Sequence, residues 1–112
     1  MAHIQHLAIR SNDPERLARF YETTFGWTRL ATRPSGGVHL SDGHINVAIL
    51  NTNGGPEGIE HFGVKLDHAD DAGGLAKHAE RRDATGIAAE HRVTDPDGNQ
   101  VDLSVKGFMD RT

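Results

Sequence analysis

The apolar positions along this chain change their period several times, and each change marks a predicted element. Apolar and other residues alternate from His3 to Arg10, which is typical of a strand with one buried face. Asp13 and Pro14 follow, and these residue types suit a helix cap and a first helical position. Apolar side chains then recur at helical spacing, which predicts a helix from Pro14 to about Thr24. Its core stripe is predicted to comprise Leu17, Phe20, Tyr21 and Phe25.

The same order of elements then continues and begins again after a linker-like stretch at 51–58. Three short strand-like runs separated by turn residues complete the first half, at 27–33, 37–40 and 44–50. The second half predicts a strand, a weaker helix and two closing strands, at 60–67, 69–82, 88–94 and 100–106. The interval between 82 and 95 is short if three strands are to follow the second helix, as they follow the first, so we expect one strand there to be abbreviated or missing.

Two pairs of segments repeat at nearly the same distance. HLAIR at 6–10 matches HFGVK at 61–65 with an offset of 61 − 6 = 55 residues. INVAI at 45–49 matches VDLSV at 101–105 with an offset of 102 − 46 = 56 residues. We therefore interpret residues 1–112 as one α+β domain of two half-modules, 1–52 and 59–112. Each half is too small to bury its own sheet, so the halves are expected to pack together or to pair across a homodimer.

The polar faces of the four strongest strands carry one chemically useful residue each: His6, Asn46, His61 and Asp102. Two residues later, each strand has a small side chain, which leaves space for a ligand. Two imidazoles and a carboxylate form a suitable ligand set for Fe, Mn, Ni or Zn as divalent ions. Asn46 would add a weak carbonyl oxygen at a fourth position or hydrogen-bond a bound water.

Composition narrows the choice of partners. The chain has a net charge of −4 and no cysteine, so a metal must be held by nitrogen and oxygen. The mild acidity argues against nucleic acid and membrane surfaces, and no apolar run approaches the ~20 residues of a membrane span. The absence of thiols and of a visible signal peptide favours a cytoplasmic location. Of the eight histidines, the six other than His6 and His61 are predicted to lie on the surface.

Three segments resemble the vicinal-oxygen-chelate superfamily, which includes glyoxalases, bleomycin-resistance proteins and dioxygenases. HLAIRSNDPERLARFYETTFGW resembles its opening half-module, HFGVKLDHADD the start of its second, and VTDPDGNQVDLSV its closing hairpin. The resemblance covers nearly the whole chain and implies paired βαβββ modules around a cleft with a divalent metal. It places the ligands at His6, His61 and Asp102, with Asn46 at the position where glyoxalases carry a carboxylate. That departure favours three ligands over glyoxalase activity.

The resemblance implies a metal-dependent enzyme that chelates a small oxygen-rich substrate through two oxygens. Lyase, isomerase and ring-cleaving oxygenase chemistry are all compatible with it, and Asp102 is the candidate catalytic residue for proton transfer. The alternative is a non-catalytic protein of the bleomycin-resistance type, which sequesters an antibiotic or metabolite in a dimer cleft.

Three cations follow the predicted ligands by four residues on the same strand faces: Arg10, Lys65 and Lys106. If the three strand ends meet, these cations ring one end of the cleft and contact an anionic group of the substrate. The competing interpretation is that they are solvated strand ends.

Overall fold

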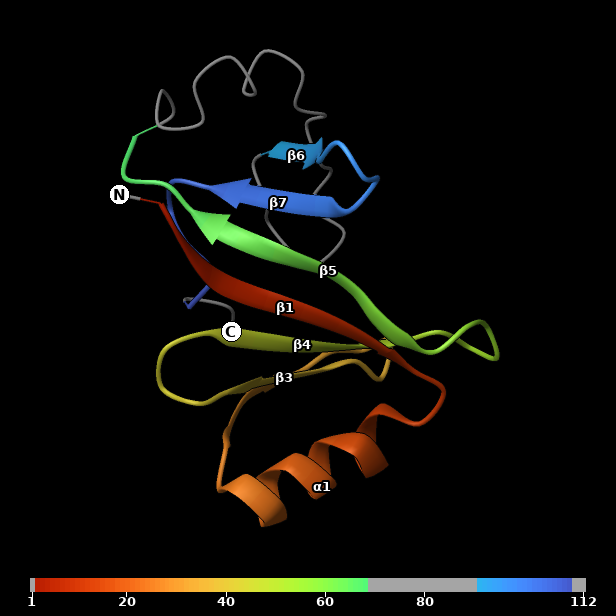
Figure 1. Cartoon of the computed structure of the whole chain (residues 1–112). Coiled ribbons are helices and arrows are strands. Elements are labelled where there is room, and N and C mark those ends of the chain that lie inside the picture. The colour runs from red at the N-terminus through yellow and green to blue at the C-terminus, as the bar shows by residue number, and fades with distance from the viewer. Residues whose placement is uncertain (1, 69–90, 110–112) are drawn as a thin grey trace.

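The computed structural model of the 112-residue chain describes residues 2–68 and 91–109. Within these ranges, one helix and seven strands form an α+β fold (Figure 1). The strands make one mixed sheet in the order β2-β3-β4-β1-β5-β7-β6. The elements are β1 (His3–Ser11), α1 (Pro14–Phe25), β2 (Thr28–Thr32), β3 (Val38–Ser41), β4 (Asn46–Asn51), β5 (Gly58–Lys65), β6 (His91–Thr94) and β7 (Gln100–Ser104).

The described elements occur where the hydrophobic pattern predicts them, with ends that differ by a few residues. The second predicted helix, at 69–82, lies outside the described residues. So does most of the interval in which an abbreviated strand is expected.

The strand pairing repeats on the two sides of a central antiparallel pair. β1 runs parallel to β4, and β5 runs parallel to β7. β1 and β5 pair antiparallel to each other and join the two sets of strands. The pairing places Asn46 beside His6, His6 beside Gly63, and Gly63 beside Asp102. One row across the middle of the sheet thus collects residues from β4, β1, β5 and β7.

The helix α1 is closed at both ends by its own sequence. The side chain of Asp13 accepts a hydrogen bond from the backbone nitrogen of Arg16 at 3.2 Å, which caps the first turn. Gly26 ends the helix in the left-handed conformation, with φ of 72°, and its N–H donates to the carbonyl of Glu22.

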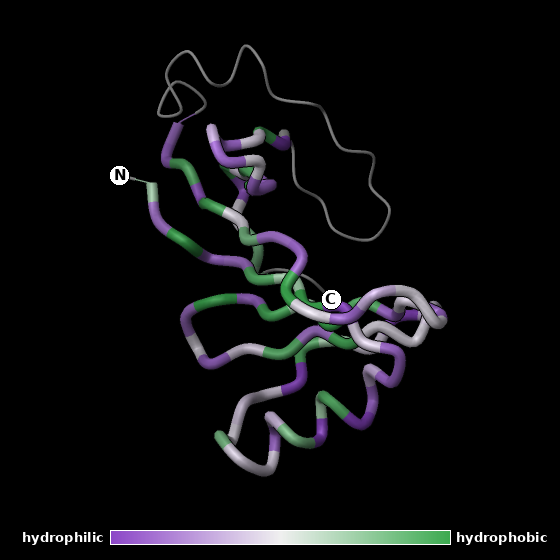
Figure 2. The backbone as a smooth tube through the Cα atoms, turned by 45° about the vertical axis from the view of Figure 1, so that its right-hand side comes forward, coloured by the Kyte–Doolittle hydropathy of each residue, from purple (hydrophilic) through white to green (hydrophobic). Residues whose placement is uncertain are grey.

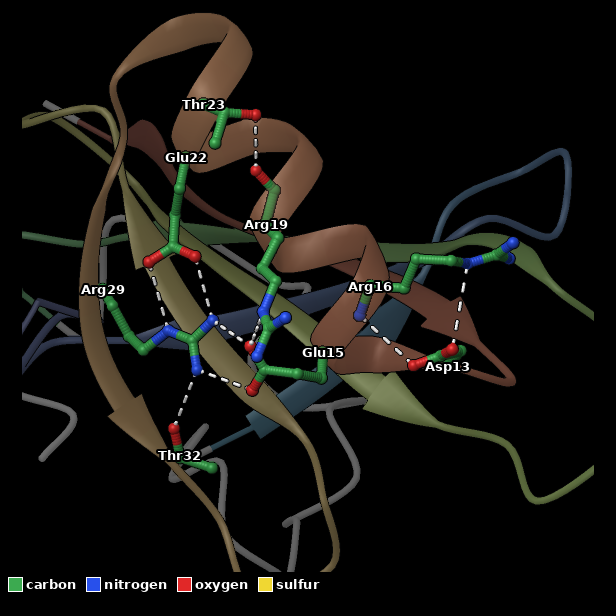
Figure 3. Close-up of polar contacts among 8 residues, drawn as sticks. All are labelled: Asp13, Glu15, Arg16, Arg19, Glu22, Thr23, Arg29 and Thr32. Atoms are coloured by element: carbon green, nitrogen blue, oxygen red, sulfur yellow. Dashed lines mark hydrogen bonds and ion pairs between the residues drawn. The ribbon is translucent and has the colours of Figure 1, made fainter.

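Arg29 of β2 holds α1 against the edge of the sheet, as Figure 3 shows. Its guanidinium lies 2.7 Å from a carboxylate oxygen of Glu15 and 2.9 Å from one of Glu22. These two glutamates lie about two turns apart on the same face of α1. Arg19 adds a further contact to Glu15 at 3.1 Å. Hydrogen bonding from Arg29 lowers the pKa of Glu15 to about 2. The ion pairs are partly exposed, so they fix the orientation of the helix more than they stabilise the fold.

The larger core cluster lies between α1 and the sheet and consists of Ala18, Val38, Leu40, Val47 and Ile49. A second cluster of Leu66, Val101 and Leu103 lies over β5 and β7. In Figure 2, hydrophobic segments concentrate in the strands, whereas hydrophilic and hydrophobic residues alternate along the helix. No helix in residues 2–68 or 91–109 combines the length and apolar character needed to cross a bilayer.

The predicted core stripe of α1 is only partly correct. Leu17 and Tyr21 pack against the core, but Phe20 and Phe25 are 54% and 59% exposed. These two rings contact each other edge to face at 6.3 Å, and Phe25 also stacks on Tyr21 at 6.1 Å, at the rim of the core. The helix places small Ala18 at its closest approach to the sheet, so the bulky rings on its flank stay outside.

Two isoleucines provide a matched test of this core. Ile49 is 1% exposed, whereas Ile59 is 73% exposed. We expect Ile49→Ala to lower the free energy of unfolding by about 2–5 kcal/mol, because it removes buried methylenes and leaves a cavity. Ile59→Ala should stay within about 0.5 kcal/mol of the original protein. Urea unfolding of both variants measures the difference, and equal losses would contradict this packing.

Candidate metal site

His6, His61 and Asp102 converge at the middle of the sheet from three neighbouring strands. The Nε2 atoms of the two imidazoles lie 3.2 Å apart, and Nε2 of His61 lies 3.0 Å from Oδ2 of Asp102. One ligand atom from each residue falls within 4.8 Å of the others. All three side chains are buried, with residue exposures of 3% or less. The structure therefore brings together the three residues that the sequence repeat singles out.

Gly63 leaves the space in which the ring of Phe108 packs beside His6. It stands between His6 and Asp102 in the row across the sheet. A Cβ atom at this glycine would lie 2.7 Å from Cβ of His6 and 2.7 Å from Cζ of Phe108, closer than real side chains approach. Because position 63 carries no side chain, the ring of Phe108 can lie beside His6, while His61 comes from the next row, opposite Ala8.

Phe108 closes the space beside the imidazoles, and the sequence pattern does not identify it. Its ring stacks on His6 with centroids 4.7 Å apart and planes inclined by 9°. The backbone nitrogen of Phe108 donates to Oε1 of Gln5 at 2.7 Å, and that of Gly107 donates to the Ser104 hydroxyl at 2.9 Å. The segment after β7 is thus fastened across the sheet. Its one aromatic residue belongs to no periodic run that would mark it as buried.

Arg92 is the second residue of the candidate site that the sequence pattern did not identify. Its Nε donates to Oδ1 of Asp102 at 2.6 Å, and its Nη2 lies 3.2 Å from Nδ1 of His61. Gln100 accepts a further hydrogen bond from the same guanidinium. A signal for it exists, because β6 pairs with β7 and places Arg92 directly opposite Asp102. If β6 and β7 are taken as a hairpin around the turn at 95–99, strand alternation puts Arg92 on the same face as Asp102.

Glu60 completes the surroundings of His61. Its Oε2 lies 3.0 Å from Nδ1 of His61, on the side of the ring away from His6. Arg10 approaches the other carboxylate oxygen at 3.6 Å. Imidazoles that bind metals commonly donate their second N–H to a carboxylate, which orients the ring. Glu60 is placed to do this for His61.

Asn46 lies behind His6 instead of among the three donor atoms. Its Oδ1 accepts a hydrogen bond from Nδ1 of His6 at 2.9 Å, on the side of the ring opposite the Nε2 that faces His61. The amide of Asn46 therefore does not lie at the fourth ligand position that the sequence predicts. His39, predicted to be a surface residue, is buried beside it, because β3 lies between β2 and β4 in the sheet.

The three cations do not ring one end of a cleft, which corrects that expectation. β1 and β5 are antiparallel, so Arg10 lies opposite Gly58 at one end of the pair and Lys65 lies opposite His3 at the other. Arg10 and Lys65 each follow their histidine by four residues, and on antiparallel strands these steps lead in opposite directions. Arg10 instead contacts Glu60, whereas Lys65 pairs with Ser104, near the chain segment that carries Lys106.

Burial and charge separate the protonation states of the two imidazoles. Burial lowers the pKa of His6 to about 4, so this ring is neutral at pH 7. Burial also acts to lower the pKa of His61, but hydrogen bonds with Asp102 and Glu60 outweigh it and raise the pKa. Burial tends to raise the pKa of Asp102, yet hydrogen bonds from His61 and Arg92 outweigh it and keep the carboxyl ionised.

The donor set fits a divalent metal ion. Ligand atoms about 2.1 Å from one ion lie about 3.0 Å apart at right angles and about 3.4 Å apart at tetrahedral angles. The 3.2 Å and 3.0 Å separations around Nε2 of His61 fall in this range. Arg92 engages Oδ1 of Asp102, which leaves Oδ2 directed at the imidazoles.

Comparison with known proteins identifies the family. The model of the Glyoxalase/Bleomycin resistance protein/Dioxygenase superfamily matches residues 3–103, and the chain belongs to this superfamily. No curated protein matches the chain significantly by sequence.

Solved structures share the fold at low sequence identity. A hypothetical protein from Bacillus halodurans C-125 is 14% identical, with a TM-score of 0.66 and coverage of 91% of this chain and 92% of that one. The 2,3-dioxygenase LapB from Pseudomonas sp. KL28 is 22% identical, with a TM-score of 0.69, and the match covers 91% of this chain but 40% of LapB. A methylmalonyl-CoA epimerase in complex with methylmalonyl-CoA and NH4+ is 17% identical, with a TM-score of 0.61 and coverage of 96% and 98%.

The space at Gly63 can be tested by filling it. We expect Gly63→Ala to lower the free energy of unfolding by about 1–3 kcal/mol, because the new methyl group overlaps Phe108 and His6. Adding Phe108→Leu should recover part of that loss, since it removes the ring atom nearest the new methyl group. Urea unfolding of both single variants and the double variant measures this coupling. Simple additivity of the two single losses would contradict the contact.

Proposed function

We propose that this chain is a metal-dependent enzyme whose divalent ion is held by His6, His61 and Asp102. The observation that carries the proposal is the meeting of two imidazole nitrogens and one carboxylate oxygen within 4.8 Å at a buried point of the sheet. Bound there, the ion supplies Lewis-acid chemistry toward two oxygens of a small oxygen-rich substrate. Lyase, isomerase and ring-cleaving oxygenase reactions all use such chemistry, and Fe, Mn, Ni and Zn all suit the donor set.

The protein's own residues prepare the site for this task. Burial keeps His6 neutral at pH 7, so one of its two ring nitrogens presents a lone pair without first losing a proton. Glu60 orients the ring of His61, and Arg92 holds the carboxylate of Asp102 through Oδ1. Because Arg92 and His61 lower the pKa of Asp102, this residue suits the role of ligand better than that of general base. Its part in proton transfer stays a prediction.

Metal binding by designed variants tests the proposal. We expect the original protein to bind about one Mn, Fe, Ni or Zn ion per chain, and His61→Ala to weaken that affinity by more than about 100-fold, beyond the effect of losing an outer contact. Metal analysis and calorimetric titration measure both.

His44→Ala is the matched control, because His44 is exposed and lies outside the cluster of donor atoms. Its affinity should equal that of the original protein. Failure of the original protein to bind any of these ions would overturn the enzyme proposal, as would equal affinities for His61→Ala and His44→Ala.

One observation favours a second candidate, a non-catalytic binding protein of the bleomycin-resistance type. Arg92 and a protonated His61 carry two positive charges, and the carboxylates of Asp102 and Glu60 beside them carry two negative charges, with contacts of 2.6 Å and 3.0 Å to Asp102 and 3.0 Å from His61 to Glu60. The cluster is therefore electrostatically complete without an ion. Tight binding of an antibiotic or metabolite by chelator-treated protein, unchanged in His61→Ala, would favour sequestration over catalysis.

We also propose that the protein forms a homodimer. One chain leaves Phe20 and Phe25 of α1 more than half exposed, with their rings in contact. Exposed aromatic pairs of this kind are typical of interfaces. Light scattering coupled to gel filtration should give twice the mass of one chain, and a monomeric mass at high concentration would contradict it.

A further inference from the structure

A buried chain of contacts runs from His39 through Asn46 to His6. The three residues come from β3, β4 and β1, and each is 2% exposed or less. Nδ1 of His6 lies 2.9 Å from Oδ1 of Asn46. On the other side of the amide, Nδ2 of Asn46 lies 3.1 Å from Nδ1 of His39. Both separations are those of ordinary hydrogen bonds.

The orientation of the Asn46 amide decides which nitrogen of His6 carries the proton. An amide offers an acceptor and a donor of almost the same shape, so its partners determine which end faces which neighbour. With Oδ1 toward His6, the ring must donate from Nδ1 and keeps a lone pair on Nε2. With the amide reversed, His6 would accept at Nδ1, and its proton would stand on Nε2 among the donor atoms of the metal site.

His39 selects the first orientation. Its Nδ1 lies 3.1 Å from Nδ2 of Asn46 and 3.3 Å from Oδ1, so the shorter contact has the amide donating to His39. A neutral His39 with its proton on Nε2 accepts this bond at Nδ1. The oxygen of the amide is thereby directed at His6.

We infer that His39 and Asn46 are positioning residues that hold His6 in the tautomer whose Nε2 is free to bind a metal ion. The inference rests on the proposed function for the identity of the ion site, but the tautomer itself is a property of the metal-free protein. It assigns Asn46 a role other than ligand. It also assigns a role to His39, which acts on His6 through the amide of Asn46.

Nitrogen-15 NMR of the histidine rings in metal-free protein tests the first half of the inference. We expect His6 to carry its proton on Nδ1 in the original protein. His39→Phe removes the acceptor for the amide and should let the Nε2-protonated form of His6 appear. His39→Asn places an amide oxygen near the former Nδ1 and should restore the original tautomer. His44→Gln, an exposed histidine in the neighbouring turn, is the matched control and should leave the His6 signals unchanged.

Calorimetric metal titration of the same variants tests the second half. We expect His39→Phe and Asn46→Leu to weaken metal affinity by about 10–100-fold, as losses of outer-sphere partners commonly do. His39→Asn and His44→Gln should retain the original affinity.

The possible results separate the two proposals. An Nε2-protonated His6 in the original protein would overturn the inference, as would a tautomer that His39→Phe leaves unchanged. Metal affinity unaltered in both His39→Phe and Asn46→Leu would also overturn it. The expected tautomers in a protein that binds no metal would preserve the positioning roles and remove the proposed enzyme function.

Discussion

The antiparallel pairing of β1 with β5 is the contact on which the rest of the structure depends. On each side of it, a parallel pair repeats, β1 with β4 and β5 with β7. Neither set of strands would bury enough apolar surface alone, and the central pair makes one sheet of both. The same pair brings His6 and His61 within 3.2 Å, although they are 55 residues apart in the chain. Fold and candidate site therefore share one structural cause.

This pairing places a row of polar groups inside the protein, where each needs a partner. Contacts pass from Asn46 to His6, His61, Asp102 and Arg92, across the middle of the sheet. Buried ionic groups are weak contributors to stability, because desolvation offsets most of their attraction, and apolar replacements are often neutral or stabilising. A polar row of this kind is therefore better explained by what it binds than by what it adds to folding. The two apolar clusters outside the row supply the packing.

The sequence was sufficient to predict the described strands, the first helix and the convergence of His6, His61 and Asp102, because alternation assigns each side chain to a face. The residues His6, His61 and Asp102 share the polar face for this reason. Alternation does not encode the relative direction of two distant strands. The predicted ring of Arg10, Lys65 and Lys106 failed on that point, since β1 and β5 run in opposite directions.

Other parts of the site depend on side-chain packing that no period records. Phe108 follows the last strand in a short tail, and only its stacking on His6 reveals its place. Asn46 was correctly put on the polar face, yet which atom of His6 its amide contacts depends on rotamers and on His39. Arg92 became part of the site through the hairpin that sets it opposite Asp102.

The two candidate functions use the same residues. They differ in whether a metal ion or a proton carries the positive charge between His61 and Asp102. Nε2 of His61 lies 3.0 Å from Oδ2 of Asp102, so a proton on that nitrogen would be shared with this oxygen, whereas Arg92 donates to Oδ1. A divalent ion would replace that proton and leave the arginine contact in place, because the two oxygens face different partners. Metal and proton therefore compete at His61, whose pKa is raised, far more than at His6, whose pKa is lowered to about 4. The choice between catalysis and sequestration thus depends on whether an ion displaces the proton of His61 at the working pH.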